Sequence, residues 1–158
     1  MSDLSSRSTV TISSQSHSYD VIIGSGVVGA RVASQLHQLG YRPRIAQLRH
    51  ATDLFDCSVV VLAHGAPHSA LAATFVAQGI AVVSVSDNLA DVLALLDIQD
   101  RALARNVPVI VGAACSPGMS GLLVHHVTRA FESIDEVHVA VHGTGGPQCA
   151  RQHHESLA

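Results

Sequence analysis

Residues 21–40 read VIIGSGVVGARVASQLHQLG, a short apolar run followed by three spaced glycines and an amphipathic segment. Gly24, Gly26 and Gly29 match the Gly-x-Gly-x-x-Gly fingerprint of a dinucleotide-binding loop. Gly24 closes the apolar run and Gly29 falls in the first turn of the helical pattern, which is the strand, turn and helix order that the motif requires. Because glycine supplies 12 of the 158 residues, the spacing alone is weak, and the rest of the chain has to support it.

Each glycine has a separate expected role. Gly24 permits the tight turn, Gly26 lets the backbone approach a pyrophosphate, and Gly29 allows the helix to pack closely on the strand. The unpaired amides and the positive dipole end of the helix then face the phosphates. A tight strand-to-helix turn without a ligand is the alternative. The expected pyrophosphate contacts are Gly24, Ser25, Gly26, Val27, Val28 and Gly29.

Short apolar runs rich in β-branched residues alternate with helical patterns along the chain. The expected strands are Val21–Ile23, Arg44–Ala46, Val59–Leu62, Ala81–Val85, Val107–Val111 and Val137–Val141. The expected helices are Val28–Leu39, Ser69–Gln78, Asn88–Arg105 and Gly118–Phe131, and residues 49–56 leave room for about one helical turn. This alternation predicts an α/β fold of the Rossmann type: a doubly wound, mostly parallel sheet of about six strands with helices on both faces.

Composition limits the partners and the chemistry. The net charge of −3 and the pI near 6.4 argue against nucleic acid as a partner. All nine basic residues are arginines, so no lysine of this chain can form a Schiff base or act as an acid or base. The odd set Cys57, Cys115 and Cys149 fits a reducing compartment, and we expect a cytoplasmic protein. The longest apolar run, 81–85, is too short to insert across a membrane.

The chain divides into three expected parts. Residues 1–18 contain eight serines and lack a continuous apolar stretch, so we expect a disordered Ser-rich tail. Residues 19–146 form the expected dinucleotide-binding domain. Residues 147–158 begin a helix or a linker to a second domain that this sequence does not contain.

The end of the second expected strand bears on the choice of cofactor. NAD sites place an acidic side chain there for the ribose hydroxyls, but residues 44–50 read RIAQLRH, with Arg49 and His50 in that place. An arginine favours the 2′-phosphate of NADP through charge-assisted hydrogen bonds. The cofactor expected is therefore NADP rather than NAD. Asp53 could serve NAD if the loop curls back, and a solvated surface Arg49 is the remaining alternative.

Four stretches carry a resemblance to a known family: VIIGSGVVG, VVVLAHGAPHSALAATFVAQGIAVVSVSDN, NVPVIVGAACSPGMSGLLV and VHVAVHGTGG. Together they span most of residues 20–146. The sequence resembles the N-terminal NADP-binding domain of saccharopine dehydrogenase-like reductases, and more loosely the dihydrodipicolinate reductase and homoserine dehydrogenase group.

The resemblance implies further site residues. A loop that lies against the ribose and nicotinamide maps onto Ala63, His64 and Gly65. A Pro-Gly turn that opens a helix near the substrate cleft maps onto Ser116, Pro117 and Gly118. Such reductases continue into a substrate-binding and oligomerising domain, so the resemblance implies the cofactor-binding half of an enzyme.

Other candidates have competing interpretations. Cys115 stands where a helix dipole could lower its pKa, but burial as a small hydrophobic residue is the more common role. Asp87 either lines the cleft or caps a helix, and His64 either contacts the cofactor or caps a helix. The eleven histidines lack the spacing of a zinc site, so no metal is expected.

These features favour an NAD(P)-dependent oxidoreductase that acts on a small metabolite, with amino-acid-related compounds among the candidates. A regulatory nucleotide-sensing domain without catalysis is the alternative from another class, and a module that has lost its ligand is a third. The expected partners are the dinucleotide and the small-molecule substrate, and the apolar helices leave room for a homodimer.

Overall fold

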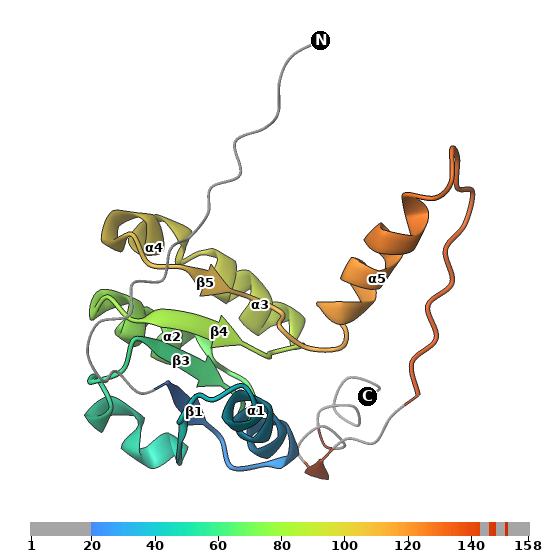
Figure 1. Ribbon diagram of the computed structural model, residues 1–158. Helices are drawn as coiled ribbons and strands as arrows, with labels where there is room; N and C mark the ends of the chain where they lie inside the picture. Colours follow the sequence, from blue (N-terminus) through green and yellow to red (C-terminus); the bar gives the residue numbers. More distant parts are fainter. Residues whose placement is uncertain (1–19, 143–145, 148–150, 152–158) are drawn as a thin grey trace.

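The computed structural model describes residues 20–142, 146, 147 and 151. Its centre is a sheet in which every pairing is parallel, in the order β2-β1-β3-β4-β5 (Figure 1). After β2 the chain passes β1 to reach β3, so the strand order reverses between β1 and β3, as in a doubly wound fold. The strands are β1 (Val21–Ile23), β2 (Arg44–Ala46), β3 (Val59–Leu62), β4 (Ala81–Ser84) and β5 (Val109–Ile110).

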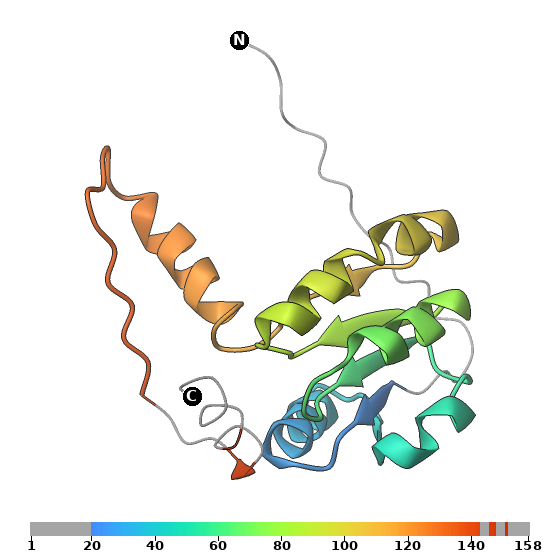
Figure 2. The same cartoon turned by 180° about the vertical axis from the view of Figure 1, so that it is seen from behind.

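Helices cover both faces of the sheet. The helix α1 (Val27–Gln38) packs on β1 and β2, whereas α2 (Ser69–Ala77) packs on β4 together with α3 (Leu89–Leu96) and α4 (Gln99–Arg105). Seen from behind, α2, α3 and α4 form one layer in front of the strands (Figure 2). The short 3-10 helix η1 (Leu48–Asp53) joins β2 to β3. The predicted Rossmann-type α/β fold is confirmed, with five strands in the described part of the chain.

The core lies between the sheet and the layer of α2, α3 and α4. Phe75 on α2 is fully buried and meets the Phe55 ring edge-on, with 5.6 Å between the ring centroids. Strand residues alternate toward this side because side chains along a strand point to opposite faces. The remaining core side chains include Val21, Ile23, Val60, Leu62, Ala72, Val76, Val82, Leu95 and Ile98.

Two expected elements differ from the structure. The predicted helix 88–105 is divided into α3 and α4, with the break at Asp97 and Ile98. Ile98 is only 7% exposed, so the break lets the chain turn this side chain into the core. The predicted strand Val137–Val141 is wrong, because these residues are exposed and form no strand hydrogen bonds in the structure.

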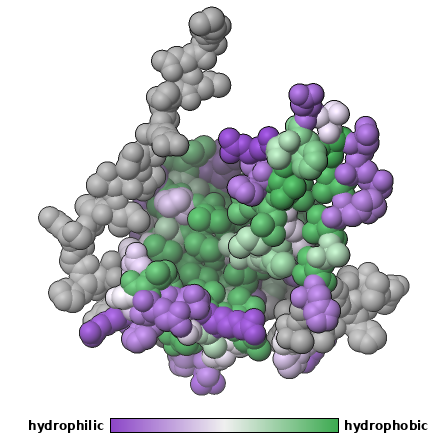
Figure 3. Space-filling view, turned by 45° about the vertical axis from the view of Figure 1, so that its right-hand side comes forward, coloured by the Kyte–Doolittle hydropathy of each residue, from purple (hydrophilic) through white to green (hydrophobic). Residues whose placement is uncertain are grey.

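Residues 119–142, which we call the arm, follow the sheet. The arm consists of α5 (Met119–Thr128) and the irregular chain after it, and no residue of α5 is buried. Figures 1 and 2 both show it standing away from the sheet. Its apolar side chains add to the broad hydrophobic area that Figure 3 shows on this side of the molecule.

Some expectations concern other parts of the chain. The predicted tail of residues 1–18 and most of the terminal segment 147–158 lie outside the described residues. Within the described residues, each helix is too short or too polar to cross a membrane.

Candidate functional site

The glycine loop lies at the carboxyl end of β1, where the strand order reverses. Gly24 has φ +119°, a conformation that other residues rarely adopt. A Cβ atom at Gly29 would overlap the carbonyl oxygen of Gly24, so only glycine lets α1 pack this closely on the turn. The structure thus assigns Gly24 and Gly29 the conformational roles expected from the motif.

Gly26 occupies a different environment. It is the N-cap residue of α1, and a Cβ atom there would meet nothing within 4 Å. The amides of the first helical turn have no partner within a helix, and this first turn contains no acidic residue. Ser25, Gly26, Val27 and Val28 are all exposed. The open space above a bare helix N-terminus fits a phosphate group.

The loop after β3 lies directly against the glycine loop. The Ala63 amide donates to the Ile23 carbonyl at 2.8 Å. A Cβ atom at Gly24 would be only 2.6 Å from the carbonyl carbon and oxygen of Ala63, and 2.8 Å from the His64 nitrogen. Ala63, His64 and Gly65 are half-buried at this place. The structure therefore brings these two sets of predicted cofactor contacts together at the β1/β3 switch point, where ligands bind in open α/β sheets.

The His64 ring has one engaged and one unengaged nitrogen. Nδ1 lies 2.7 Å from the Gly65 carbonyl oxygen, and because a carbonyl only accepts, Nδ1 carries the hydrogen. Nε2 is buried and has no hydrogen-bond partner in the described structure, so it offers a free lone pair. Burial lowers the pKa of the His64 imidazole, although its contact with Gly65 acts in the opposite direction.

A buried polar cluster stands behind this loop. His68 and Ser84 are fully buried, and the His68 ring lies 4.3 Å from the His64 ring between centroids. The Asp91 carboxylate, on α3, accepts hydrogen bonds from the amides of His68 at 2.8 Å and Ser69 at 3.0 Å. Asp91 of α3 thereby satisfies the N-terminus of α2.

The pKa of Asp91 reflects this environment. Burial alone would raise it, but the Ser86 side chain and the backbone amides of His68 and Ser69 outweigh burial and hold the pKa below its ordinary value. The carboxylate is therefore charged at neutral pH, which suits its position at the positive end of a helix dipole.

Few features of the sequence indicate this buried polar cluster. His68 is one of eleven histidines that lack the spacing of a zinc site. Ser84 and Asp91 interrupt apolar patterns, VVSV and LADVLALL, and a polar residue on a buried face is the signal that could have pointed to them.

Arg49 and His50 lie in η1, just after β2. Both are exposed, and the Arg49 Nε donates to the His50 Nε2 at 3.0 Å. The end of β2 adjoins the glycine loop, since the Gly24 amide donates to the Ala46 carbonyl at 3.0 Å. The terminal guanidinium nitrogens of Arg49 form no hydrogen bond in the described structure. These exposed nitrogens are therefore available to hydrogen-bond an anion.

The substrate-cleft candidates lie one and two strands further along. Asp87 is exposed after β4, and the neighbouring Asn88 caps α3 by accepting from the Asp91 amide at 3.0 Å. The N-cap residue of α3 is therefore Asn88 and not Asp87.

The loop 112–118 follows β5 and is tied to the end of β4. The Ala113 amide donates to the Ser84 carbonyl at 2.8 Å. Cys115 is exposed with a free thiol, so the interpretation as a buried hydrophobic residue is wrong. Ser116 and Pro117 are exposed as well, and Gly118 is the N-cap residue of α5.

No cluster of three metal-ligating side chains occurs among the described residues.

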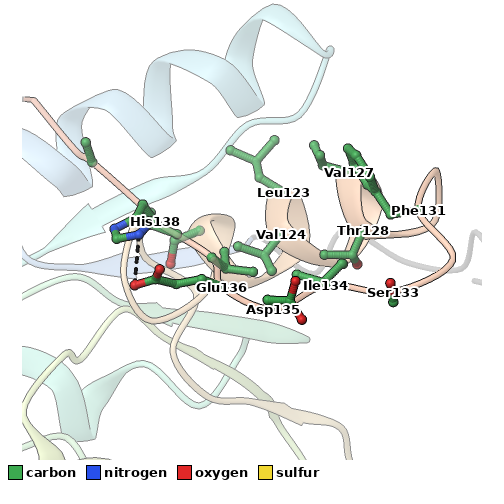
Figure 4. Close-up of a pocket in the computed structure, with 14 residues that line it drawn as sticks. Leu123, Val124, Val127, Thr128, Phe131, Ser133, Ile134, Asp135, Glu136 and His138 are labelled. Carbon is green, nitrogen blue, oxygen red and sulfur yellow. Dashed lines mark ion pairs between the residues drawn. The ribbon is translucent and has the colours of Figure 1, made fainter.

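A groove of about 700 Å³ lies on the arm, and Figure 4 shows Leu123, Val127 and Phe131 along it. Apolar side chains dominate this groove, whereas backbone amides converge at the switch point. We therefore place the candidate site at the switch point.

Comparison with known proteins yields likeness in structure only. No protein-family model and no curated protein matches the chain. A homoserine dehydrogenase from S. aureus is 14% identical with a TM-score of 0.45, and the match covers 61% of this chain and 32% of that one. GenD2 from gentamicin A biosynthesis, solved in complex with NAD, is 19% identical with a TM-score of 0.48, covering 81% and 44%. An oxidoreductase domain protein from Kribbella flavida is 18% identical with a TM-score of 0.40, covering 60% and 26%.

This chain spans about a third of the homoserine dehydrogenase. Since all three TM-scores are below 0.5, we base the fold on the strand order and the crossovers of the chain itself. One of the three is a homoserine dehydrogenase, the group in the looser part of the resemblance, but a likeness at this TM-score does not assign a family. None of the three is a saccharopine dehydrogenase, so that part stays a prediction.

Proposed function

We propose that this chain is the dinucleotide-binding unit of an NAD(P)-dependent oxidoreductase that acts on a small metabolite, with amino-acid-related compounds as the first class to test. One observation carries the proposal. At the switch point, Gly24 and Gly29 fill positions where a side chain would clash, while Gly26 faces open space at a bare helix N-terminus. That combination is what a pyrophosphate needs from the backbone.

The residues around the loop have complementary tasks in this proposal. The amides of residues 26–28 bind the pyrophosphate, and the half-buried loop of residues 63–65 lies beside it. The bound nicotinamide supplies hydride transfer, and the protein orients it beside the substrate. The loop 112–118 borders the space left for that substrate.

Arg49 is the proposed determinant of NADP preference. Arg49 lies three residues after β2, and the end of β2 adjoins the glycine loop. No acidic side chain occurs in residues 44–50. A guanidinium can bind the 2′-phosphate with two parallel hydrogen bonds, which a ribose hydroxyl cannot match. Arg49 would therefore contribute to binding of NADPH far more than of NADH.

Titration of the full chain with NADPH and with NADH, followed by nicotinamide fluorescence, tests both statements. We expect Arg49→Ala to weaken NADPH binding by about 10- to 100-fold, the worth of charge-assisted hydrogen bonds, and NADH binding by less than about 3-fold. Arg42→Ala removes the same charge at the opposite end of β2 and serves as the control.

Different results would contradict the proposed function and the proposed NADP preference. Failure of the wild-type chain to bind either nucleotide would overturn the proposed function. Equal weakening of both nucleotides in Arg49→Ala would refute the NADP preference alone.

A further inference from the structure

The His68 ring is held in one tautomer and one orientation. Its Nε2 lies 2.9 Å from the His64 carbonyl oxygen, which only accepts, so Nε2 carries the hydrogen. Its Nδ1 lies 2.8 Å from the Ser84 hydroxyl, which can then donate to it. The Ser84 oxygen in turn accepts from the Ser86 amide at 3.2 Å. In this arrangement both ring nitrogens are satisfied inside a fully buried side chain.

The backbone of His68 is held as firmly as its ring. Both oxygens of the Asp91 carboxylate accept from the His68 amide, at 2.8 and 2.9 Å. Asp91 belongs to α3 and Ser84 to β4. Two elements, α3 and β4, therefore determine where the His68 Nε2 lies.

The His68 Nε2 donates a hydrogen bond to the loop that packs against the glycine turn. The His64 carbonyl it contacts belongs to the same short segment, 63–64, that packs against Gly24. Gly24 and Ala63 are packed so closely that a Cβ atom at Gly24 would lie 2.6 Å from the Ala63 carbonyl. A displacement of residues 63–64 would therefore displace Gly24 as well, because close-packed groups transmit strain.

We propose that His68 is a positioning residue for the dinucleotide site, acting through the His64 carbonyl on the Gly24 turn. The inference rests on the proposed function. His68 itself touches no ligand; it keeps the pyrophosphate-binding turn in the geometry that the helix N-terminus requires. The effect should therefore include the pyrophosphate half of the ligand and persist when the nicotinamide is absent.

A purely structural role makes a different prediction. If His68 only fills the core, every substitution lowers the free energy of unfolding, and the molecules that remain folded bind as before. If His68 positions the turn, binding depends on whether a donor still reaches the His64 carbonyl.

Two substitutions at His68 distinguish the roles. The amide nitrogen of His68→Gln can stand near the former Nε2 and donate to His64, whereas the shorter His68→Asn reaches only the former Nδ1. Val76→Ala, in the buried face of the same helix, is the matched control for lost stability. Binding of NADPH and of 2′-phospho-ADP-ribose, which lacks only the nicotinamide, is measured for each at a temperature where all are folded.

We expect His68→Asn to weaken both ligands by about 10-fold, the worth of one buried hydrogen bond, while His68→Gln and Val76→Ala stay within about 3-fold of wild type. Equal binding by the Asn and Gln variants would overturn the proposal. So would a loss confined to NADPH. If both His68 variants fail to fold, Ser84→Ala carries the test, because it frees the ring without removing it, and an unchanged affinity there would overturn the proposal too.

Hydrogen exchange of the ligand-free protein keeps this test separate from the proposed function. We expect the amides of residues 24–26 to exchange faster in His68→Asn than in His68→Gln or Val76→Ala. If the wild-type chain binds no dinucleotide, the proposed function fails, and a faster exchange would still support the coupling from His68 to the turn. Unchanged exchange in His68→Asn would refute it.

Discussion

The sheet with α1–α4 and the arm are built from similar residues and have opposite environments. The strands β1 and β3 consist of valine, isoleucine and leucine and are almost entirely buried. The arm carries Val137, Val139 and Val141 at the same alternating spacing, and these side chains are 47–59% exposed. An alternating apolar pattern therefore shows which side chains of a segment could be buried. Whether they are buried depends on the strands and helices that pack beside the segment.

The reason lies in the partners of each segment. Backbone groups of β1 are hydrogen-bonded on both sides, to β2 and to β3. The chain after α5 forms no strand ladder among the described residues, and the ion pair between Glu136 and His138, at 3.0 Å, is largely exposed to water (Figure 4). Screened surface pairs of this kind contribute little to stability. Four measurements test this contrast between the sheet and the arm.

Truncation of a phenylalanine should separate the two regions most clearly. Phe75→Ala removes a fully buried ring and should lower the free energy of unfolding by about 3–5 kcal/mol. Phe131→Ala, in the arm, removes a ring that is 61% exposed and should change it by less than about 0.5 kcal/mol. Urea unfolding followed by circular dichroism measures both, and comparable losses would show that the arm is packed in solution.

Glycine substitutions should change stability in opposite directions. Gly29→Ala places a methyl group against the Gly24 carbonyl and should cost about 1–3 kcal/mol through overpacking. Gly121→Ala, inside α5, meets nothing within 4 Å and should stabilise the helix by up to about 1 kcal/mol. Thermal unfolding checks the signs. A neutral Gly29→Ala would mean that α1 packs less closely on the turn than described.

The Asp91 carboxylate should make stability depend on pH. Its pKa is lower in the folded chain than in the unfolded chain, so the unfolded state binds more protons as the solution is acidified. The contribution of Asp91 is present above its unfolded pKa and is lost as pH falls through the lower folded pKa. Asp91→Asn should therefore cost about 1–2 kcal/mol at pH 7 and progressively less in acid.

Urea unfolding of both proteins between pH 7 and pH 3 measures this difference. The exposed Asp135 of the arm provides the matched control, and Asp135→Asn should change stability at pH 7 by less than about 0.5 kcal/mol. A gap between wild type and Asp91→Asn that stays constant over the whole range would contradict the role given to the charge.

The smallest expected effect is a lowered pKa of the His64 imidazole. Burial lowers its pKa from the ordinary 6.5, so its ring should remain neutral in mildly acidic solution. A histidine NMR titration gives the midpoint, with His64→Asn identifying the resonance. A midpoint at or above 6.5 would mean that the ring is more solvated than the structure describes, and would remove the unpaired acceptor from the proposed site.

Much of the fold and part of the site follow from local sequence. The strand, turn and helix over residues 21–38 were predicted from apolar periodicity and glycine spacing, and their bounds differ from the structure by a single residue. Gly40 and Gly79 follow the ends of α1 and α2 with positive φ, a role that glycine favours. Such signals are local, because a turn conformation or a helical face involves residues only a few positions apart.

The sequence by itself determined the order of strands and helices, the glycine turn and the absence of lysine chemistry. Only the tertiary structure decided that His68, Ser84 and Asp91 meet at one edge of the sheet, that Cys115 is exposed, and that residues 137–141 stay outside the sheet. The first set depends on short-range geometry written into consecutive residues. The second depends on segments far apart in the chain, whose burial and hydrogen bonds exist only after the parallel strands have brought them together.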